Sequence, residues 1–149
     1  MSRRIALLAV AVAAAWSVPA RAEVIDGNRI VIIDGDTVAL PCAMPARGCA
    51  EKVRFIAIDA PETFRPTCEN ERAVGLRAKA RVAKMLRGAT VYVERSGRKD
   101  RYGRTLANLK TADGDVGQAL LNARLALPYK PGKVAKARRL AHWCSNHEN

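Results

Sequence analysis

The stretch Arg54-Phe-Ile-Ala-Ile-Asp59-Ala-Pro61-Glu62-Thr63 is the segment around which we expect the rest of this chain to be organised. Its first half is apolar except for Arg54, which is the pattern of a largely buried strand. Pro61 ends that strand, because it lacks a backbone N–H for the sheet and biases the residue before it toward an extended conformation. Asp59 and Glu62 flank this stop. The stretch therefore predicts a cation and two carboxylates held at one strand end, an arrangement suited to phosphate and metal chemistry.

Two further segments combine turn residues with charges. Asp34-Gly35-Asp36-Thr37 separates two apolar β-like runs, and we expect Gly35 to supply a positive φ in that turn. Asp100-Arg-Tyr-Gly-Arg104 lies in a polar, basic turn. Each motif alone is a weak signal, since Asp-Gly-Asp is common in turns. The three together occur in an order and at separations that fit one domain.

The remaining segments predict a small α+β domain. Glu69 to Leu86 is rich in Ala, Arg, Lys and Leu, carries acids in its first turn and ends before Gly88, as a helix does. We expect its buried stripe to consist of Leu76, Ala80, Ala83 and Leu86. The expected strands are residues 29–33, 37–40, 53–58, 90–94 and 105–109, and the other expected helices are 116–123 and 134–144. Five strands with a helix between the third and the fourth is the order of an OB-fold barrel.

Residues 1–22 are predicted to be a secretory signal peptide. Arg3 and Arg4 form a basic n-region, an uncharged and mostly apolar stretch follows, and Ala20-Arg21-Ala22 has the small-x-small form of a cleavage site. The apolar stretch is too short to cross ~30 Å of hydrocarbon as a helix, which argues against a membrane anchor. We therefore expect an exported protein, secreted or periplasmic, with a single domain at residues 23–149.

The composition is strongly basic, with a formal net charge of +12 for the whole chain. The leader contributes three arginines and no acid, so residues 23–149 keep a charge of +9. A basic excess of this size favours a polyanionic partner, either nucleic acid or an anionic membrane or cell-wall polymer. We expect the domain to be a monomer.

All four cysteines lie within residues 23–149. An even number in an exported chain points to two disulfides, among three possible pairings. A zinc site is the competing interpretation, but the chain has no Cys-x-x-Cys or His-x-x-x-His spacing. Cys42 and Cys49 bracket a loop between two strands and are expected to pair, which leaves Cys68 to bond Cys144.

Histidine is absent from residues 1–141 and occurs only at His142 and His147. A Ser-His-Asp or Cys-His mechanism therefore has no base in the middle of the chain, and paired cysteines leave no free thiol. Carboxylates, guanidinium groups, phenols and a metal ion remain for catalysis.

Taken together, the three motifs resemble the thermonuclease, or staphylococcal nuclease-like, family. The resemblance runs from about Ile30 to about Trp143. It implies an α+β domain with a five-stranded OB-fold β-barrel and three α-helices. It also implies hydrolysis of DNA and RNA with low sequence specificity, leaving 3′-phosphate ends. The chain departs from the family in the loop of residues 41–50, which is longer than usual, and before Tyr129, where the segment is shorter.

Asp36 and Asp59 are candidate metal ligands. Their carboxylates are hard oxygen donors, which suit Ca²⁺ rather than zinc or copper. The resemblance implies one calcium ion held by these two residues and by the backbone carbonyl of the residue after the second, here Ala60. The alternative is that Asp36 only caps its turn through its side chain.

Arg54, Arg104 and Glu62 match the catalytic positions of the family. The resemblance implies that Arg54 and Arg104 bind the scissile phosphate, whose equatorial oxygens gain negative charge in the transition state and suit planar guanidinium groups. It implies that Glu62 activates or orients the attacking water. The alternatives are a structural ion pair for Arg54, a solvated loop charge for Arg104 and a surface glutamate for Glu62.

Tyr102, Tyr129 and Lys130 match positions near the bound nucleotide in the family. Stacking on a base tolerates any sequence, which fits a nuclease of low specificity. Either tyrosine could instead pack against the protein. The main rival to the nuclease hypothesis is a non-catalytic OB-fold module that binds nucleic acid or another polyanion.

Overall fold

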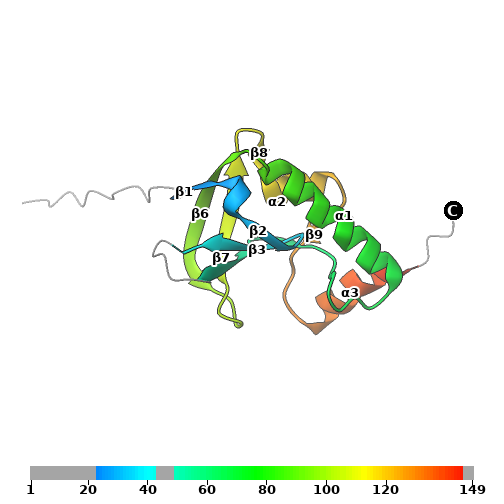
Figure 1. Cartoon of the computed structure of the whole chain (residues 1–149). Helices are drawn as coiled ribbons and strands as arrows, with labels where there is room; N and C mark the ends of the chain where they lie inside the picture. Colours follow the sequence, from blue (N-terminus) through cyan, green and yellow to red (C-terminus); the bar gives the residue numbers. More distant parts are fainter. Residues whose placement is uncertain (1–22, 43–48, 146–149) are drawn as a thin grey trace, which may run out of the picture.

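The computed structural model describes residues 23–42 and 49–145, so the predicted signal peptide lies outside the described residues. The strands are β1 (Glu23–Asp26), β2 (Val31–Asp34), β3 (Thr37–Pro41), β4 (Ala50–Phe55), β5 (Ile58–Asp59), β6 (Thr90–Lys99), β7 (Thr105–Thr111), β8 (Gly114–Asp115) and β9 (Leu127–Pro128). The helices are α1 (Glu69–Leu86), α2 (Val116–Asn122) and α3 (Lys133–Cys144), and a 3-10 turn, η1 (Gly27–Arg29), follows β1 (Figure 1).

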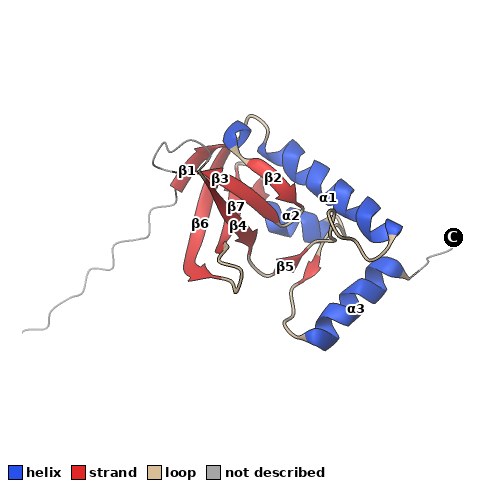
Figure 2. Ribbon diagram, turned by 60° about the horizontal axis from the view of Figure 1, so that its bottom comes forward, coloured by secondary structure: helices blue, strands red, loops and turns tan. Residues whose placement is uncertain are grey.

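Most strands belong to one continuous mixed sheet with the order β1-β6-β7-β4-β3-β2, and β8 pairs with β7 beside this path. β4 and β7 run parallel, while the other neighbours are antiparallel. β5 and β9 form a separate two-stranded ladder. The predicted α+β OB-fold class is confirmed. Among the described residues strand pairing leaves the barrel open, with β1 and β2 at its edges (Figure 2).

The strand predicted at residues 53–58 is two strands. β4 ends at Phe55 and β5 begins at Ile58, because Ala57 takes a left-handed backbone conformation (φ 63°) and turns the chain. β6 continues to Lys99, past the predicted end at Glu94, since it forms a long hairpin with β7. The sheet also contains β1, which pairs with β6 and was not predicted.

The hydrophobic core lies between the sheet and the helices α1 and α2. Its largest fully buried apolar side chains are Val38, Leu40, Val53, Val82, Leu86, Val91, Val93, Leu109, Val116 and Leu120. Along most of β7 buried and less buried residues alternate, as expected for a strand with one face on the core. Burying one such side chain stabilises the fold by about 1.5–3 kcal/mol.

The buried stripe predicted for α1 is wrong except at Leu86, and Leu76 is exposed. The buried positions are Glu71, Val74, Gly75, Ala78, Val82 and Leu86. The helix approaches the turn between β2 and β3 so closely that a Cβ on Gly35 would lie 2.6 Å from the Cβ of Ala78. The small residues Gly35 and Ala78 therefore permit the close contact between α1 and this turn. Gly35 has no positive φ, so its expected conformational role is wrong and its role is steric.

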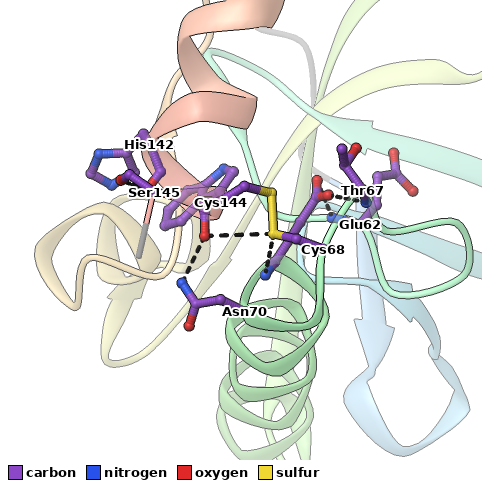
Figure 3. The surroundings of a disulfide bond; sticks show 9 residues. Glu62, Thr67, Cys68, Asn70, His142, Cys144 and Ser145 are labelled. Atoms are coloured by element: carbon purple, nitrogen blue, oxygen red, sulfur yellow. Dashed lines mark hydrogen bonds between the residues drawn. A yellow bond between two sulfur atoms is a disulfide. The ribbon is translucent and has the colours of Figure 1, made fainter. Parts of the chain in front are cut away.

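The structure forms both predicted disulfides. Cys42 and Cys49 join the end of β3 to the start of β4, with 5.6 Å between their Cα atoms. Cys68 and Cys144 join the N-cap of α1 to the last residue of α3 (Figure 3). Asn70 Nδ2 adds a hydrogen bond of 2.7 Å to the carbonyl of Trp143. The C-terminal helix is therefore fixed against α1.

Within the described ranges, no helix has the length and apolar character of a membrane span.

Candidate active site

The break between β4 and β5 positions the candidate site. After Ala57 turns the chain, its carbonyl accepts a hydrogen bond of 2.8 Å from the Tyr129 N–H. The short β5–β9 ladder then pairs Asp59 with Leu127. Two segments distant in sequence, the strand end at Asp59 and the proline-rich turn after β9, are thus held side by side.

Arg54 lies between the two candidate metal ligands. Its Nη1 pairs with Asp36 Oδ1, and its Nη2 lies 2.6 Å from Asp59 Oδ1. The same Nη2 donates to the carbonyl of Ile58 at 3.4 Å. The side chain of Arg54 is 13% exposed. One planar guanidinium therefore orients both carboxylates. Asp36 comes from the turn between β2 and β3, and Asp59 comes from β5. These contacts are the ion pairs that were considered as the alternative for Arg54, and binding of the scissile phosphate by Arg54 stays a prediction.

Asp36 is almost completely buried, at 1% exposure. Its Oδ2 accepts a 2.6 Å hydrogen bond from the Ala60 N–H, and its Oδ1 accepts one of 3.0 Å from the Thr37 hydroxyl. Burial raises the pKa of Asp36 above its ordinary value, although the charge of Arg54 and these hydrogen bonds act in the opposite direction. Asp36 is thus a buried carboxylate that binds the backbone of Ala60, 24 positions further along the chain, in addition to the local contact with Thr37.

Arg104 is held against Asp100. Its Nε and Nη2 each lie 2.7 Å from Asp100 Oδ2, and its Nη1 donates to the Thr37 hydroxyl at 3.3 Å. Partial desolvation of Asp100 favours a higher pKa, but the hydrogen bonds from Arg104 and Tyr102 outweigh it and lower the pKa. The Asp100 carboxylate therefore stays charged and fixes the guanidinium. Through Thr37, Arg104 is connected to Asp36.

Glu62 lies at the edge of this charged cluster. Its side chain remains exposed, and no donor among the described residues hydrogen-bonds to its carboxylate. Nearby protein atoms desolvate the carboxylate and raise its pKa, the charges of Asp34 and Asp36 raise it further, and Arg54 lowers it. The net effect of these influences is a raised pKa for Glu62.

The segment that carries Glu62 is held by a buried glutamate that sequence reasoning did not identify. Glu71 of α1 is 2% exposed and accepts hydrogen bonds from the N–H groups of Thr67, at 2.6 Å, and Glu62, at 3.4 Å (Figure 3). The sequence indicated only that acids occupy the first turn of this helix. The structure shows that one of them fixes the loop between β5 and α1.

The two tyrosines lie at different parts of the surface. Tyr102 is 68% exposed and has the guanidinium carbons of Arg101 and Arg104 at 4.8 and 5.4 Å from its ring centre. Tyr129 is 50% exposed, with the guanidinium of Arg139 at 5.5 Å. Neither ring is packed into the core, so both are available for contact. Lys130 follows Tyr129, is exposed, and accepts a 2.8 Å hydrogen bond on its carbonyl from Arg139 Nη1.

Arg139 is the main residue of this region that the sequence did not indicate. It comes from α3, is 13% exposed, and its Nε pairs with Asp59 Oδ2 although the N–H is not aligned for a hydrogen bond. No local motif marks it. The only signal was indirect: the predicted bridge from Cys68 to Cys144 places the last helix near the segment of Glu62.

The donor set fits a hard cation with a partial protein shell. The described residues contain no group of three or more His, Cys, Asp or Glu side chains arranged to hold a metal ion. Asp36 and Asp59 provide two carboxylates that both bind Arg54, and a Ca²⁺ ion held by them would take its further ligands from backbone oxygens and water. Zinc sites are built mainly from His and Cys ligands, and neither Asp36 nor Asp59 is paired with one of these among the described residues.

The described chain is thus a small α+β domain of the OB-fold class in which carboxylates orient Arg54 and Arg104. Residues 52–145 match the family described as staphylococcal nuclease homologue, and the chain belongs to this nuclease family. It is 28% identical over 141 residues to the SPbeta prophage-derived endonuclease YokF of Bacillus subtilis (strain 168). That match covers 83% of this chain and 46% of the relative, so the chain spans about half the length of this curated relative.

Proposed function

We propose that this protein is an exported, Ca²⁺-dependent nuclease that hydrolyses phosphodiester bonds of DNA and RNA with low sequence specificity and leaves 3′-phosphate ends. The observation that carries the proposal is the arrangement of Arg54, which binds both Asp36 and Asp59. The family supports phosphodiester chemistry, and the curated endonuclease relative supports cleavage of nucleic acid. We propose that the domain acts as a monomer.

The two arginines would bind the scissile phosphate. Arg54 is held by two carboxylates and Arg104 by one, so both guanidinium groups are oriented before substrate arrives. A pre-oriented donor is effective because little reorganisation is needed when charge develops on the phosphate oxygens. A guanidinium also has five N–H donors, so pairing with a carboxylate leaves others for phosphate.

Glu62 would accept a proton from the attacking water or orient it. Its raised pKa makes it a stronger base than an ordinary surface glutamate, and no donor among the described residues engages its carboxylate. Calcium, held by Asp36, Asp59 and the backbone carbonyl of Ala60, would supply positive charge beside the phosphate. Water would attack phosphorus, and the bond to the 5′-oxygen would break.

Two sequence features support export. Residues 1–22 have the form of a signal peptide, and the chain forms two disulfides, which persist in oxidising compartments. We propose a secreted or periplasmic location. Peptide mapping of the protein recovered from medium and periplasm would test it, since cleavage after Ala22 is expected.

The activity test uses the oxidised protein of residues 23–149 and single-stranded DNA. Cleavage is expected with calcium and not with EDTA, and Glu62→Gln is expected to reduce the rate by about 10²–10⁴-fold. Glu69→Gln, at an exposed position in the first turn of α1, makes the same chemical change and is the control. Binding of DNA without cleavage in calcium would contradict the proposal and favour the non-catalytic binding module.

A further inference from the structure

A groove of about 500 Å³ lies between the β9 segment and α3, next to the candidate active site. We call it the α3 groove. Its apolar lining includes Leu127, Pro128 and Val134. Its basic lining residues are Lys130, Arg138, Arg139 and His142, and the described residues that line it include no acid. An apolar surface bordered by positive charge is complementary to a nucleotide, which has an apolar base face and an anionic phosphate.

The α3 groove is continuous with the candidate active site. Leu127, in the groove, is the cross-strand partner of Asp59. Directly opposed residues of an antiparallel pair have Cα atoms about 4.5–5.5 Å apart. Arg139 both lines the groove and pairs with Asp59. A nucleic acid strand with a phosphate at Arg54 and Arg104 could therefore continue into the groove along one surface.

Two of the basic side chains are not engaged by protein acids. Arg139 is paired with Asp59, but neither Lys130 nor Arg138 forms an ion pair with any described residue. Both are exposed. Their charges are thus available to phosphate, and phosphate neutralisation by lysine and arginine is the main source of affinity for nucleic acid strands.

We propose that the α3 groove binds a nucleotide unit of the substrate strand next to the scissile phosphate, with its base or sugar on the apolar residues and its phosphate at Lys130 and Arg138. The assignment rests on the proposed nuclease function, since it takes a polynucleotide as the substrate. It adds a specific expectation: substrates long enough to reach the groove bind more tightly than those that are too short.

The first experiment measures binding without cleavage. The affinity of a fluorescein-labelled single-stranded oligonucleotide of about eight nucleotides is measured by fluorescence anisotropy in EDTA. Val134→Asp places a negative charge in the groove, and Arg138→Ala removes a positive one. Each is expected to weaken binding by about tenfold. Leu76→Asp and Arg81→Ala make the same chemical changes on exposed positions of α1 and are expected to bind like the unaltered protein.

The second experiment separates the groove from the reaction. With calcium present, kcat/KM is measured for oligonucleotides of increasing length, starting from a dinucleotide. The unaltered protein is expected to gain efficiency with length, and the two groove variants are expected to lose most of that gain through KM, with kcat retained. A loss confined to kcat would contradict the assignment.

The outcomes are distinguishable from those for the proposed function. Full affinity and full length dependence in both groove variants would overturn the groove assignment while leaving the nuclease function intact, and would point to a protein or lipid occupant. Weaker binding in both variants without cleavage by any form would support the groove and overturn the nuclease function. Circular dichroism checks that each variant is folded, and the exposed position of Arg138 provides a second variant if Val134→Asp is unstable.

Discussion

Arg139 of α3 pairs with Asp59 at the end of β5, so the C-terminal helix places a cation on a candidate metal ligand. The Cys68–Cys144 disulfide and the hydrogen bond from Asn70 to Trp143 fix the end of that helix against α1. Arg139 is therefore not a mobile surface arginine, and a metal ion that binds Asp59 has to compete with its charge.

Replacing Arg139 by alanine is expected to strengthen calcium binding and weaken the metal-free fold. Without the competing guanidinium, the dissociation constant for calcium, measured by isothermal titration calorimetry, should fall about three- to tenfold, a change of up to about 1.4 kcal/mol. In EDTA, the free energy of unfolding should fall by about 1 kcal/mol, because Asp59 keeps Arg54 and both partners are partly exposed. Lys136→Ala, exposed on the same helix, is the control. Unchanged or weaker calcium binding in Arg139→Ala would contradict this prediction.

Asp36→Asn is expected to weaken calcium binding and to stabilise the metal-free protein. Calcium affinity should fall by more than the roughly 10–100-fold that changes around metal ligands cost. In EDTA at pH 7, however, the variant should be more stable than the unaltered protein. The pKa of Asp36 is raised by burial, so the native state binds more protons than the unfolded state and stability falls as pH rises through this range. Asparagine is uncharged, so its burial at pH 7 does not destabilise the native state in this way.

Urea unfolding in EDTA at pH 7 and at a pH below the ordinary Asp value of 3.8 tests this relationship. The stability difference between Asp36→Asn and the unaltered protein should be present at the higher pH and disappear at the lower one. A variant that is less stable at pH 7 would mean that the pairing with Arg54 outweighs the burial of the carboxylate.

The pair formed by Asp100 and Arg104 predicts two graded losses of activity. Arg104→Ala removes a phosphate ligand and should lower kcat by about 10²–10³-fold at saturating calcium. Asp100→Asn leaves the arginine but weakens its orientation, and should lower kcat by about tenfold. Arg98→Ala, exposed in the same hairpin, is the control. Near-normal turnover by Arg104→Ala would remove this arginine from the reaction.

Glu51 predicts a pH dependence of stability that is independent of the candidate site. Partial burial alone would raise its pKa, but hydrogen bonds from Arg95 and Thr105 outweigh burial and lower it below the ordinary value of 4.5. A lowered pKa means stabilisation that is present above the unfolded value and lost as pH falls through the folded one. Glu51→Gln should therefore be less stable than the unaltered protein by about 0.5–1 kcal/mol at pH 7, since the cluster is partly exposed.

The same unfolding measurement checks the Glu51 prediction. The difference between Glu51→Gln and the unaltered protein should shrink as pH falls below 4.5. The buried Trp143 provides the fluorescence signal. Glu69→Gln, at an exposed position in the first turn of α1, is the control. A stability difference that is constant from pH 7 to pH 3 would show that the charge of Glu51 is not involved.

The sequence alone determined the features that depend on neighbouring residues. The start and end of α1 follow from its helix-forming composition and from Gly88, and the structure has the predicted bounds Glu69–Leu86. An even cysteine count left three pairings open, and one short loop favoured the pairs Cys42–Cys49 and Cys68–Cys144, which the structure contains. The residue types of the candidate site were also evident from three short motifs.

Which surfaces of the helices and strands contact one another depends on the tertiary structure. The buried face of α1 was predicted from leucine and alanine positions, but the close approach of Ala78 to Gly35 in the β2–β3 turn turns a different face of the helix toward the core. The break at Ala57 and the pairing of Asp59 with Leu127 depend on a backbone turn that no local pattern marks. Arg139 reaches Asp59 across a separation of 80 positions. Local composition determines helices and strands, whereas contacts such as these depend on how the finished elements pack, and packing is a property of the whole chain.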